Sequence, residues 1–457
     1  MESKRKDYIL DDVIKMQTTK VDSDLINIEN YISTENMLPY KGGIKQASGL
    51  PEQDKYLQFK KGDILFSNIR TYFRKVWKAS FDGGASNDVI VFRTKDEHVL
   101  DQSFLYHLLA DERFIEFTVT TAKGTKMPRG DKSAMKTYEF SLPIDIKEQK
   151  RIAHILGSLD DKIELNWQMN QTLEQMAQAL FKSWFIDFDP VIDNALAAGN
   201  PIPDELQAKA EQRKALGKDR KALPEEIQRL FPDEFEYSEE LEKWIPKGWR
   251  VEPLSTFINV KHGYAFKGEF FSAEPTDNIL LTPGNVKVGG GFKSDKYKYY
   301  KGEIPEDYIL KKDDLIITMT DLSKEGDTLG FPAFVPEIKN DVFLHNQRLG
   351  KVEFKNTKLN KSFLYYSLCV PRYRHEILGS ASGTTVKHTA PSKILAHKIL
   401  FSNAILLDVF EKQCSSFFSK MQQNEMNNIQ LTKLRDTLLP RLISGEVRVP
   451  DVEKIIK

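Results

Sequence analysis

The sequence predicts a mixed α/β protein, built from two similar globular units and two long helices that pack as an antiparallel coiled coil with pseudo-two-fold symmetry. A first observation is a repeated motif: Ser103-Phe104-Leu105-Tyr106 returns as Ser362-Phe363-Leu364-Tyr365, and Gly124-Thr125 and Gly383-Thr384 follow the two copies at the same spacing. A second is a long stretch after each copy in which seam residues alternate by four and three, the pattern of packed helices. A globular unit followed by a long helix, repeated once, suits a long ligand that is itself in two parts.

Length and composition agree with a soluble protein of several domains. The 457 residues are enough for two or three domains, and 40% hydrophobic with 29% charged residues is ordinary for globular proteins. No apolar run reaches the roughly 18 residues of a membrane span, and the N-terminus lacks the apolar core of a secretory signal. Two cysteines, Cys369 and Cys414, are too few for a disulfide framework or a zinc site. We therefore expect a cytoplasmic protein.

The net charge of zero conceals an uneven distribution. Between Lys60 and Lys78 there are six basic residues and one acidic residue, and between Thr121 and Tyr138 five basic and one acidic. Because local fields attract charged ligands, basic segments can bind polyanions even in a neutral chain.

The first globular unit is expected over residues 1–146. Asp63–Ser67 and Asp88–Arg93 are apolar runs rich in β-branched and aromatic residues, typical of strands. Ser103–Phe117 has helical spacing, and Thr121–Thr137 is polar with glycine and proline, which indicates a loop.

The first long helix is expected over residues 147–186, opened by Asp145 and Glu148 in an arrangement that resembles a capping box. The following segment, 187–245, is rich in proline, alanine and charge. We expect it to be an extended connector with short helical pieces.

The second globular unit is expected over residues 246–403, where Asp314–Met319 matches the first unit's strand in position. The second long helix is expected over 404–443, with Pro440 kinking it or ending its regular part because proline removes a backbone donor. Residues 444–457 would be a tail.

Four asparagines interrupt the apolar seams and are expected to fix the helix register, since such a residue is tolerated where it meets a polar partner. Antiparallel helices would pair Asn166 with Asn428 and Asn170 with Asn424. Parallel helices would pair Asn166 with Asn424 and place both units at one end. We favour the antiparallel arrangement, because it puts one unit at each end; a third possibility is that each helix covers only its own unit. Arg435, which interrupts the second seam, is expected to snorkel outward or contact a partner chain.

Catalytic patterns are weak. The sequence has no G-x-x-x-x-G-K-[ST] phosphate-binding loop, and its eight histidines show no metal-ligand spacing. Asp341 with Glu353 and Lys355 resembles the acidic set of a magnesium-dependent nuclease, although Glu353 also fits ordinary strand alternation.

Nucleic-acid binding has better support, because cationic, hydroxyl and aromatic residues recur in matching loops. Arginine and asparagine read guanine and adenine in the major groove, while lysine and hydroxyl groups hold phosphates. The candidate DNA-binding residues of the first unit are Asn68, Arg70, Tyr72, Arg74, Lys75, Lys123, Thr125, Lys126 and Arg129. Those of the second unit are Lys261, His262, Tyr264, Lys267, Thr384, Thr385, Lys387 and His388.

Five sequence segments together resemble the specificity subunit of type I restriction-modification enzymes, over nearly the full length. The residues that carry the resemblance are Leu142-Pro143, Glu148-Gln149-Lys150-Arg151-Ile152, Leu159-Asp160-Asp161-Lys162-Ile163-Glu164-Leu165-Asn166, Ile245-Pro246-Lys247-Gly248-Trp249 and Leu434-Arg435-Asp436-Thr437-Leu438-Leu439-Pro440-Arg441-Leu442-Ile443-Ser444-Gly445-Glu446. The second long helix lacks a counterpart of the Glu148-Gln149 pair.

The resemblance implies two target recognition domains, each reading one half of an interrupted double-stranded DNA sequence. The helices would set the gap between the halves and dock two modification (methyltransferase) subunits. S-adenosylmethionine, ATP and magnesium are expected on the modification subunits and on two restriction subunits, with no cofactor, metal site or catalytic residue in this chain. Two alternatives stay open: a coiled-coil scaffold that ignores DNA, and a magnesium-dependent nuclease.

Overall fold

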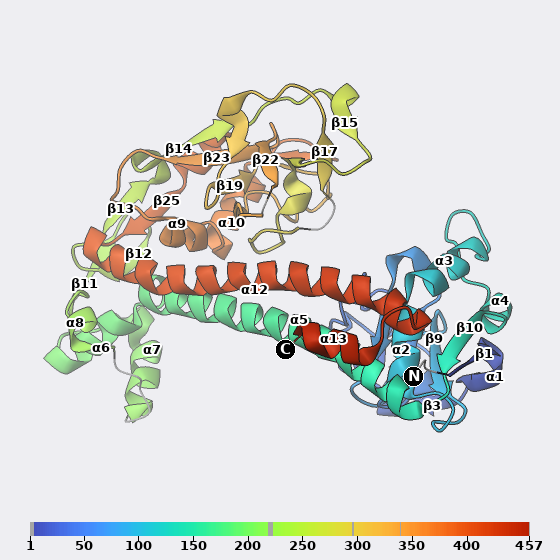
Figure 1. Ribbon diagram of the computed structural model, residues 1–457. Coiled ribbons are helices and arrows are strands. Elements are labelled where there is room, and N and C mark those ends of the chain that lie inside the picture. The colour runs from blue at the N-terminus through green and yellow to red at the C-terminus, as the bar shows by residue number, and fades with distance from the viewer. Residues whose placement is uncertain (1–3, 218–222, 295–296, 339, 457) are drawn as a thin grey trace. The chain divides into compact units, whose positions relative to one another are not determined.

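The computed structural model describes residues 4–217, 223–294, 297–338 and 340–456 (Figure 1). It divides into two compact units. Unit 1 comprises Met1–Trp167 and Asn427–Lys457, and unit 2 comprises Gln168–Met426. Both units combine helices and strands, so the mixed α/β fold class is confirmed.

The core of unit 1 is a four-stranded antiparallel sheet in the order β2-β9-β6-β7. Its strands are β2 (Ile14–Met16), β9 (Val89–Thr94), β6 (Ile64–Ser67) and β7 (Val76–Lys78). Successive side chains of a strand point to opposite faces. Accordingly Ile64 and Phe66 pack in one apolar cluster, whereas Leu65 between them packs in another. Both faces are covered, which explains why the runs 64–66 of β6 and 89–92 of β9 are apolar at every position.

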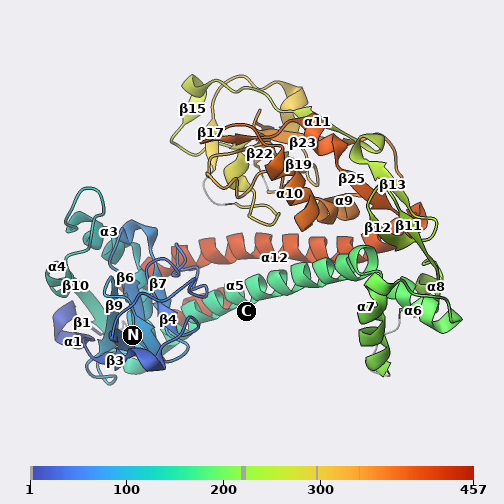
Figure 2. The same cartoon turned by 180° about the vertical axis from the view of Figure 1, so that it is seen from behind.

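Helices cover one face of this sheet and a second sheet covers the other (Figure 2). In chain order, the short helical elements of unit 1 are α1 (Leu10–Val13), η1 (Ser23–Leu25), η2 (Thr71–Phe73), α2 (Gln102–Ala110), α3 (Glu112–Thr120) and α4 (Lys132–Lys136). The second sheet, in the order β3-β5-β8-β4, contains β3 (Lys20–Asp22), β5 (Lys55–Phe59), β8 (Gly83–Ala85) and β4 (Tyr31–Ile32). Strands β1 (Arg5–Ile9) and β10 (Glu139–Pro143) form a separate antiparallel pair.

Two local predictions for unit 1 need correction. The single helix expected over Ser103–Phe117 is divided at Asp111, whose carboxylate accepts the backbone N–H of Arg113 at 2.9 Å and so begins α3. The loop expected over Thr121–Thr137 contains α4, which is capped in the same way by Asp131. In both places a short acidic cap starts a new helix where the periodicity alone indicated none.

Unit 2 repeats this architecture. Its main antiparallel sheet has the order β14-β23-β19-β21, formed by β14 (Ile258–His262), β23 (Leu349–Phe354), β19 (Leu315–Thr318) and β21 (Pro332–Phe334). Its second sheet, in the order β15-β17-β16-β22-β18, contains β15 (Phe271–Ser272), β17 (Lys298–Tyr300), β16 (Asn278–Leu281), β22 (Val342–His345) and β18 (Ile309–Leu310).

Shorter elements complete unit 2. The strand pairs are β13 (Arg250–Pro253) with β25 (Lys398–Phe401), β20 (Thr320–Asp321) with β24 (Lys387–His388), and β11 (Phe235–Ser238) with β12 (Lys243–Pro246). The helical elements are η5 (Leu254–Thr256), η6 (Gly268–Phe270), η7 (Pro283–Asn285), η8 (Glu306–Tyr308), α9 (Lys361–Ser367), α10 (Pro371–Gly379) and α11 (Pro391–Ala396).

The same connections recur in the same order in the two units. Strands β2, β9, β6 and β7 correspond to β14, β23, β19 and β21, the parallel pair β4/β8 corresponds to β16/β22, and β1/β10 corresponds to β13/β25. The short sequence repeat therefore marks a repeat of the whole scaffold.

The segment 187–245 is folded over its described residues, instead of extended as expected. It contains α6 (Asp189–Ala198), α7 (Asp204–Ala215) and α8 (Glu225–Gln228), followed by the β11–β12 hairpin. Phe188, Val191 and Phe231 are buried in the core of unit 2. These widely spaced apolar residues supply the core contacts that the charged composition conceals.

The two long helices are α5 (Ile146–Phe181), which continues into a π-helical turn (Lys182–Ile186), and α12 (Ala404–Ser444). The Asp145 carboxylate accepts the Lys147 N–H at 2.9 Å at the start of α5. Pro440 lies inside α12 and does not end it; the helix stops before Gly445, whose φ of +81° is a left-handed conformation. The expected tail contains α13 (Val449–Ile456), with Val449 and Val452 buried in the core of unit 1.

Hydrogen bonds between the seam asparagines show that α5 and α12 run antiparallel. In unit 1, the Asn166 side-chain amide donates to Asn428 Oδ1 at 2.7 Å. In unit 2, the Asn424 amide donates to Asn170 Oδ1 at 2.8 Å. These are the pairs expected for antiparallel helices, so the parallel alternative and the alternative of two unpaired helices are both wrong. The pseudo-two-fold symmetry stays a prediction.

Candidate nucleic-acid interface

In unit 1, one edge of the main sheet gathers the sequence-predicted residues. Strands β2 and β6 end there and β9 and β7 begin there, because all neighbours are antiparallel. We call this surface edge 1 and define it as residues 68–75 together with residues 123–130. These segments are two separate candidates in the sequence, and backbone hydrogen bonds join them.

The hairpin Lys123–Arg129 forms half of edge 1. Lys123 and Arg129 exchange backbone hydrogen bonds of 2.8 and 2.9 Å. The arm that returns then pairs with the chain leaving β6: the Arg70 N–H donates to the Pro128 carbonyl at 2.8 Å, and the Gly130 N–H donates to the Asn68 carbonyl at 3.0 Å. A Cβ at position 130 would lie 2.3 Å from Met135 Cε and 2.9 Å from Asn68 Oδ1, so a larger residue there would require these side chains to move.

Among the described residues, two cations of edge 1, Arg70 and Lys126, have neither an acidic partner nor a side-chain hydrogen bond. Lys126 is exposed near the tip of the hairpin beside exposed Thr125, and Arg70 is half-buried in a left-handed conformation with φ of +49°. The Tyr72 side chain is 44% exposed, and its ring centroid lies 4.7 Å from that of Phe73. These groups present hydroxyls, an aromatic ring and unneutralised positive charge to solvent.

The other candidates of edge 1 have internal partners. The ammonium group of Lys123 lies 2.5 Å from Asp131, the Arg129 guanidinium lies 3.1 Å from Asp88, and Arg74 pairs with Glu112. Two further candidates are held inside the fold. The Lys75 ammonium donates to the Thr34 carbonyl at 2.5 Å, and burial lowers the pKa of Lys75. The Asn68 side chain is buried, and its Oδ1 accepts no hydrogen bond from any described residue.

Unit 2 builds the same edge from its own hairpin. Ser382 and His388 exchange backbone hydrogen bonds of 3.0 and 2.9 Å, and the returning arm, β24, pairs with β20 directly after β19. The Thr389 N–H donates to the Met319 carbonyl at 3.0 Å, as Gly130 does to Asn68 in unit 1. We call this surface edge 2 and define it as residues 319–321, 346–348, 261–267 and 382–388.

The side chains of edge 2 differ from those of edge 1. The residue that corresponds to Arg70 is Asp321, which is buried and accepts hydrogen bonds from Ser323 and Thr328. Burial opposes ionisation there, but these hydrogen bonds lower the pKa of Asp321. On the hairpin, Thr384 and Thr385 are exposed.

Two hairpin residues of edge 2 lie close to the scaffold. Lys387 is half-buried, and His388 is exposed, with its Nδ1 within 3.1 Å of the Thr320 hydroxyl. Two similar scaffolds therefore present different polar groups.

The predicted loop Lys261–Lys267 lies at the same edge, because β14 ends beside the start of β23 and the end of β19. Lys261 donates to the Asp307 carbonyl at 3.0 Å, and its ammonium lies 4.9 Å above the Tyr308 ring. Tyr264 is 38% exposed, and its ring lies 5.3 Å from Tyr308. His262 and Lys267 are exposed, and the Lys267 ammonium lies 4.0 Å from Glu269.

Sequence reasoning missed Gln347 and Arg348, which form the turn between β22 and β23. Both are exposed at edge 2, between the Lys261 loop and the end of β19. Within the described part of the chain, Arg348 has no ion pair. No local pattern distinguishes this turn, and only the strand order brings it to the edge.

The three nuclease-like residues do not converge. Glu353 accepts a hydrogen bond from Asn259 at 3.3 Å, and Lys355 donates to the Ser255 carbonyl at 2.7 Å, both along the β14–β23 ladder. Asp341 instead precedes β22 in the other sheet, where burial and Asp277 raise its pKa. The described residues contain no group of three or more His, Cys, Asp or Glu side chains able to hold a metal ion.

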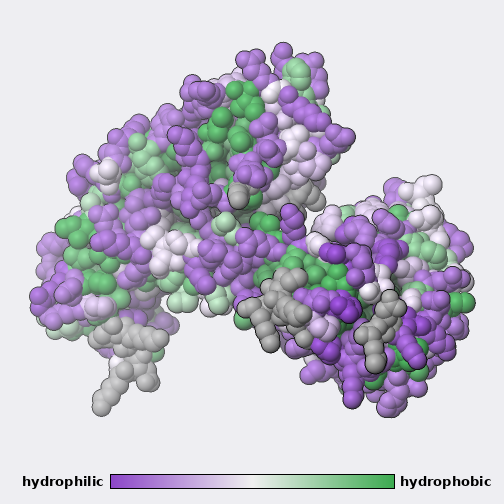
Figure 3. All heavy atoms as spheres, viewed as in Figure 1, coloured by the Kyte–Doolittle hydropathy of each residue, from purple (hydrophilic) through white to green (hydrophobic). Residues whose placement is uncertain are grey.

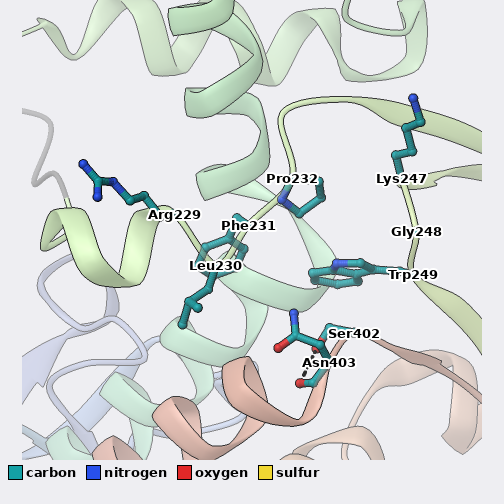
Figure 4. A pocket seen from close by; sticks show the side chains of 9 residues that line it. All are labelled: Arg229, Leu230, Phe231, Pro232, Lys247, Gly248, Trp249, Ser402 and Asn403. Carbon is teal, nitrogen blue, oxygen red and sulfur yellow. Dashed lines mark hydrogen bonds between the residues drawn. The ribbon is translucent and has the colours of Figure 1, made fainter.

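A hollow in unit 2 lies apart from edge 2. Its lining residues are Arg229, Leu230, Phe231, Pro232, Lys247, Gly248, Trp249, Ser402 and Asn403. In Figure 4 the Trp249 ring lies above Ser402 and Asn403, and the Arg229 and Lys247 side chains point away from the Trp249 ring. Lys247 pairs with Glu234 and Arg229 with Glu225, so both cations are already neutralised.

Hydrophilic side chains cover most of the surface visible in Figure 3, with smaller apolar areas between them. None of the described helices combines the length and the apolar character that crossing a membrane requires.

The fold and the two edges define a protein with two units that share one scaffold and differ in the side chains at their edges. Comparisons with known proteins agree with this class. A family model described as the type I restriction modification DNA specificity domain matches residues 3–175. The HindI type I restriction enzyme specificity subunit of Haemophilus influenzae is 28% identical to this chain, over 97% of the chain and 99% of the relative.

A second relative has a similar identity, and one solved structure shows the same fold. The MjaIX specificity subunit of Methanocaldococcus jannaschii is 27% identical, over 76% of this chain and 70% of the relative. The crystal structure of a type I restriction-modification S subunit from M. genitalium has the same fold, with a TM-score of 0.54, 16% identity and 96% of each chain covered. Along nearly its whole length the chain is similar to type I restriction-modification specificity subunits, which confirms the resemblance found in the sequence.

Proposed function

We propose that this chain is the DNA sequence-specificity subunit of a type I restriction-modification complex, and that each unit reads one half of a bipartite double-stranded target. In this proposal, edge 1 and edge 2 contact DNA. The observation that carries it is the repeated edge: one backbone scaffold presents Arg70 and Lys126 in unit 1, and Arg348 and exposed threonines in unit 2.

Different side chains on one scaffold suit the reading of two unlike half-sequences. Arginine forms paired hydrogen bonds to guanine, and lysine and hydroxyl groups bind phosphates of any sequence. The exposed aromatic rings of Tyr72 at edge 1 and Tyr264 at edge 2 would add apolar and hydroxyl contacts. In each unit, one pair of seam asparagines holds α5 and α12 in register. The helices can therefore fix the gap between the half-sites.

We further propose that the paired helices dock two modification subunits and that two restriction subunits join the assembly. Those partners would bind S-adenosylmethionine for adenine N6 methylation, and ATP and magnesium for translocation and cleavage. The chain itself would contribute recognition and no catalytic group. The names of the related proteins place them in type I restriction enzymes, and this supports the partners proposed here.

The test is genome-wide mapping of N6-methyladenine in a host that expresses the modification subunit with or without this chain. We expect a two-part motif with a fixed gap that is gained only when the chain is present. A variant with Arg70→Ala and Lys126→Ala serves as the matched control, and it should lose methylation while assembling normally.

Undivided or absent new methylation, with an active modification subunit, would contradict the proposal and favour a scaffold role. Magnesium-dependent cutting of DNA by the purified chain would instead favour the nuclease alternative.

A further inference from the structure

A short loop of unit 1, residues 38–43, is hydrogen-bonded to the segment that carries Arg70. The Tyr40 N–H donates to the Phe73 carbonyl at 2.8 Å, and the Lys41 N–H donates to the Arg74 carbonyl at 3.0 Å. Phe73 in turn donates its N–H to the Arg70 carbonyl at 2.9 Å. The loop therefore holds residues 73 and 74 of edge 1, whereas the Lys123–Arg129 hairpin holds residues 68–70.

Tyr40 and Lys41 are both left-handed, with φ of +56° and +63°. Side chains with a Cβ are disfavoured in this conformation, and two in succession persist only where the surroundings hold them. Such a loop needs an anchor.

The equivalent loop of unit 2 shows that this strain is a special feature of unit 1. Both loops begin with the same side-chain turn, in which Asn36 accepts the Ser33 N–H at 2.6 Å and Asn285 accepts the Thr282 N–H at 2.9 Å. Both are then closed by an antiparallel bridge, Met37–Ile44 in unit 1 and Val286–Phe292 in unit 2. In unit 2, however, the left-handed positions are Gly289, Gly290 and Gly291. Glycine adopts this conformation freely, whereas unit 1 has tyrosine and lysine there.

The side chain of Lys41 reaches the helix α12. It is 6% exposed, and its ammonium lies 3.0 Å from Asp436 Oδ1. Asp436 also accepts a hydrogen bond from Arg435 Nε at 2.9 Å, and Arg435 Nη1 lies 2.7 Å from the carboxylate of Asp160 in α5. The cluster thus balances two cations against two carboxylates; the Lys41 and Arg435 side chains are buried, whereas Asp436 is 45% exposed. Removing the Lys41 ammonium leaves Asp436 paired with Arg435 and detaches the loop 38–43 from α12.

A continuous set of contacts therefore runs from α12 through Asp436 and Lys41 to the backbone of the segment 70–74. Because the ammonium of Lys41 is buried and already paired, it is not available to bind a phosphate. We propose that Lys41 is a positioning residue for DNA recognition by edge 1: its ion pair with Asp436 fixes the recognition segment relative to the long helix. This inference rests on the proposed function and adds a residue through which the helix acts on sequence reading.

The test uses the full chain assembled with its modification subunit, and duplexes that carry the methylated motif or a substitution in one half. The half read by unit 1 is the one at which Arg70→Ala loses discrimination. We expect Lys41→Met to lower discrimination at that half by about tenfold and to leave the other half unchanged. Lys41→Arg, which keeps the positive charge, should retain most of the discrimination at that half. The dependence of affinity on salt should stay as in the parent complex, because no phosphate contact is lost.

Lys41→Gly separates anchoring from strain, since glycine relieves the left-handed conformation and also removes the ammonium. We expect it to fold at least as well as Lys41→Met and to lose the same discrimination. Lys55→Met is the matched control, because the Lys55–Asp22 pair is exposed on both sides.

Parent-like discrimination in Lys41→Gly would overturn the inference, and so would a uniform loss of affinity with a reduced salt dependence. A parent complex without any sequence preference would overturn the proposed function itself, a result distinct from a preference that Lys41 variants leave intact.

Discussion

Arg70 and Lys126 both lie at edge 1, but they are held differently. The backbone of Arg70 is fixed by the hairpin through its bond to Pro128, whereas Lys126 is exposed near the hairpin tip. A guanidinium on a fixed backbone suits the two-point geometry of a base edge, and an exposed ammonium suits a phosphate.

We predict that Arg70→Ala weakens binding to the proper target by about 1–3 kcal/mol and relaxes preference at one position of one half-site. Lys126→Ala should weaken binding to all sequences alike and reduce the slope of log affinity against log salt by about one. Binding titrations with the assembled complex at several salt concentrations measure both effects. Unchanged affinity and unchanged preference in both variants would rule out edge 1 as the DNA-contacting surface.

His107 gives unit 1 a specific sensitivity to acid. Burial lowers its pKa to about 4, and the nearby Asp160 carboxylate offsets this only in part. The folded state therefore binds the proton less tightly than the unfolded chain, whose histidine titrates near 6.5. Stability from neutral His107 is complete above pH 6.5 and is lost as the pH falls toward 4, by on the order of 3 kcal/mol in total.

We accordingly predict that His107→Gln flattens the dependence of the unfolding free energy on pH between 6.5 and 4.5. Glutamine can still meet the Ala153 carbonyl, which lies 3.3 Å from the histidine Nε2, but it takes up no proton in this range. Urea unfolding at a series of pH values measures the difference. An identical pH slope in the variant would show that His107 does not titrate on unfolding.

At the scale of elements, the α5–α12 seam combines apolar packing with two amide pairs. The partners Asn428 and Asn424 are buried, with 6% and 1% exposure. A leucine on one side only would leave a buried amide without its partner, which costs about 1–3 kcal/mol. Replacing both partners of a pair removes this cost, since neither polar group is left unsatisfied.

We predict that Asn166→Leu destabilises unit 1, and that adding Asn428→Leu restores or raises stability while loosening the helix register. Asn170→Leu with Asn424→Leu is the matched pair in unit 2. Thermal unfolding measures stability, and methylation mapping measures whether the gap between half-sites stays uniform. A uniform gap in the fourfold leucine variant would show that the asparagines do not set the register.

At the scale of the whole molecule, unit 1 is assembled from both ends of the chain and unit 2 from its middle. Leu442 has no exposed surface and packs in the same cluster as Leu10 and Ile152, although more than half of the chain separates them in sequence. Folding of unit 1 therefore requires the C-terminal part of α12.

We predict that Leu442→Ala destabilises unit 1 by about 2–5 kcal/mol through the cavity it leaves. Hydrogen exchange should rise in peptides from residues 4–167 and stay low in peptides from unit 2. Leu165→Ala, at a side chain that is 57% exposed, is the control and should change neither. Equal loss of protection in both units would mean that they unfold as one cooperative body.

Local sequence determined the elements and the repeat. β-Branched and aromatic runs identified β6 and β9, and the recurring Ser-Phe-Leu-Tyr motif identified two copies of one scaffold. The asparagine spacing placed all four asparagines on the seam, because spacing along a helix fixes which residues share its face, but it fitted both antiparallel and parallel pairing. Each of these features depends on residues close together in sequence.

Tertiary structure alone decided how the edges are composed. The bond between Arg70 and Pro128 and the exposure of Arg348 at edge 2 arise from pairing between distant strands, which leaves no periodic signal. Arg435 was expected to snorkel outward or to contact a partner chain; it is 5% exposed and pairs with Asp160 on the other helix. Sequence pattern shows which side chains are charged, whereas only the packed fold decides which charges meet a partner and which stay free for a ligand.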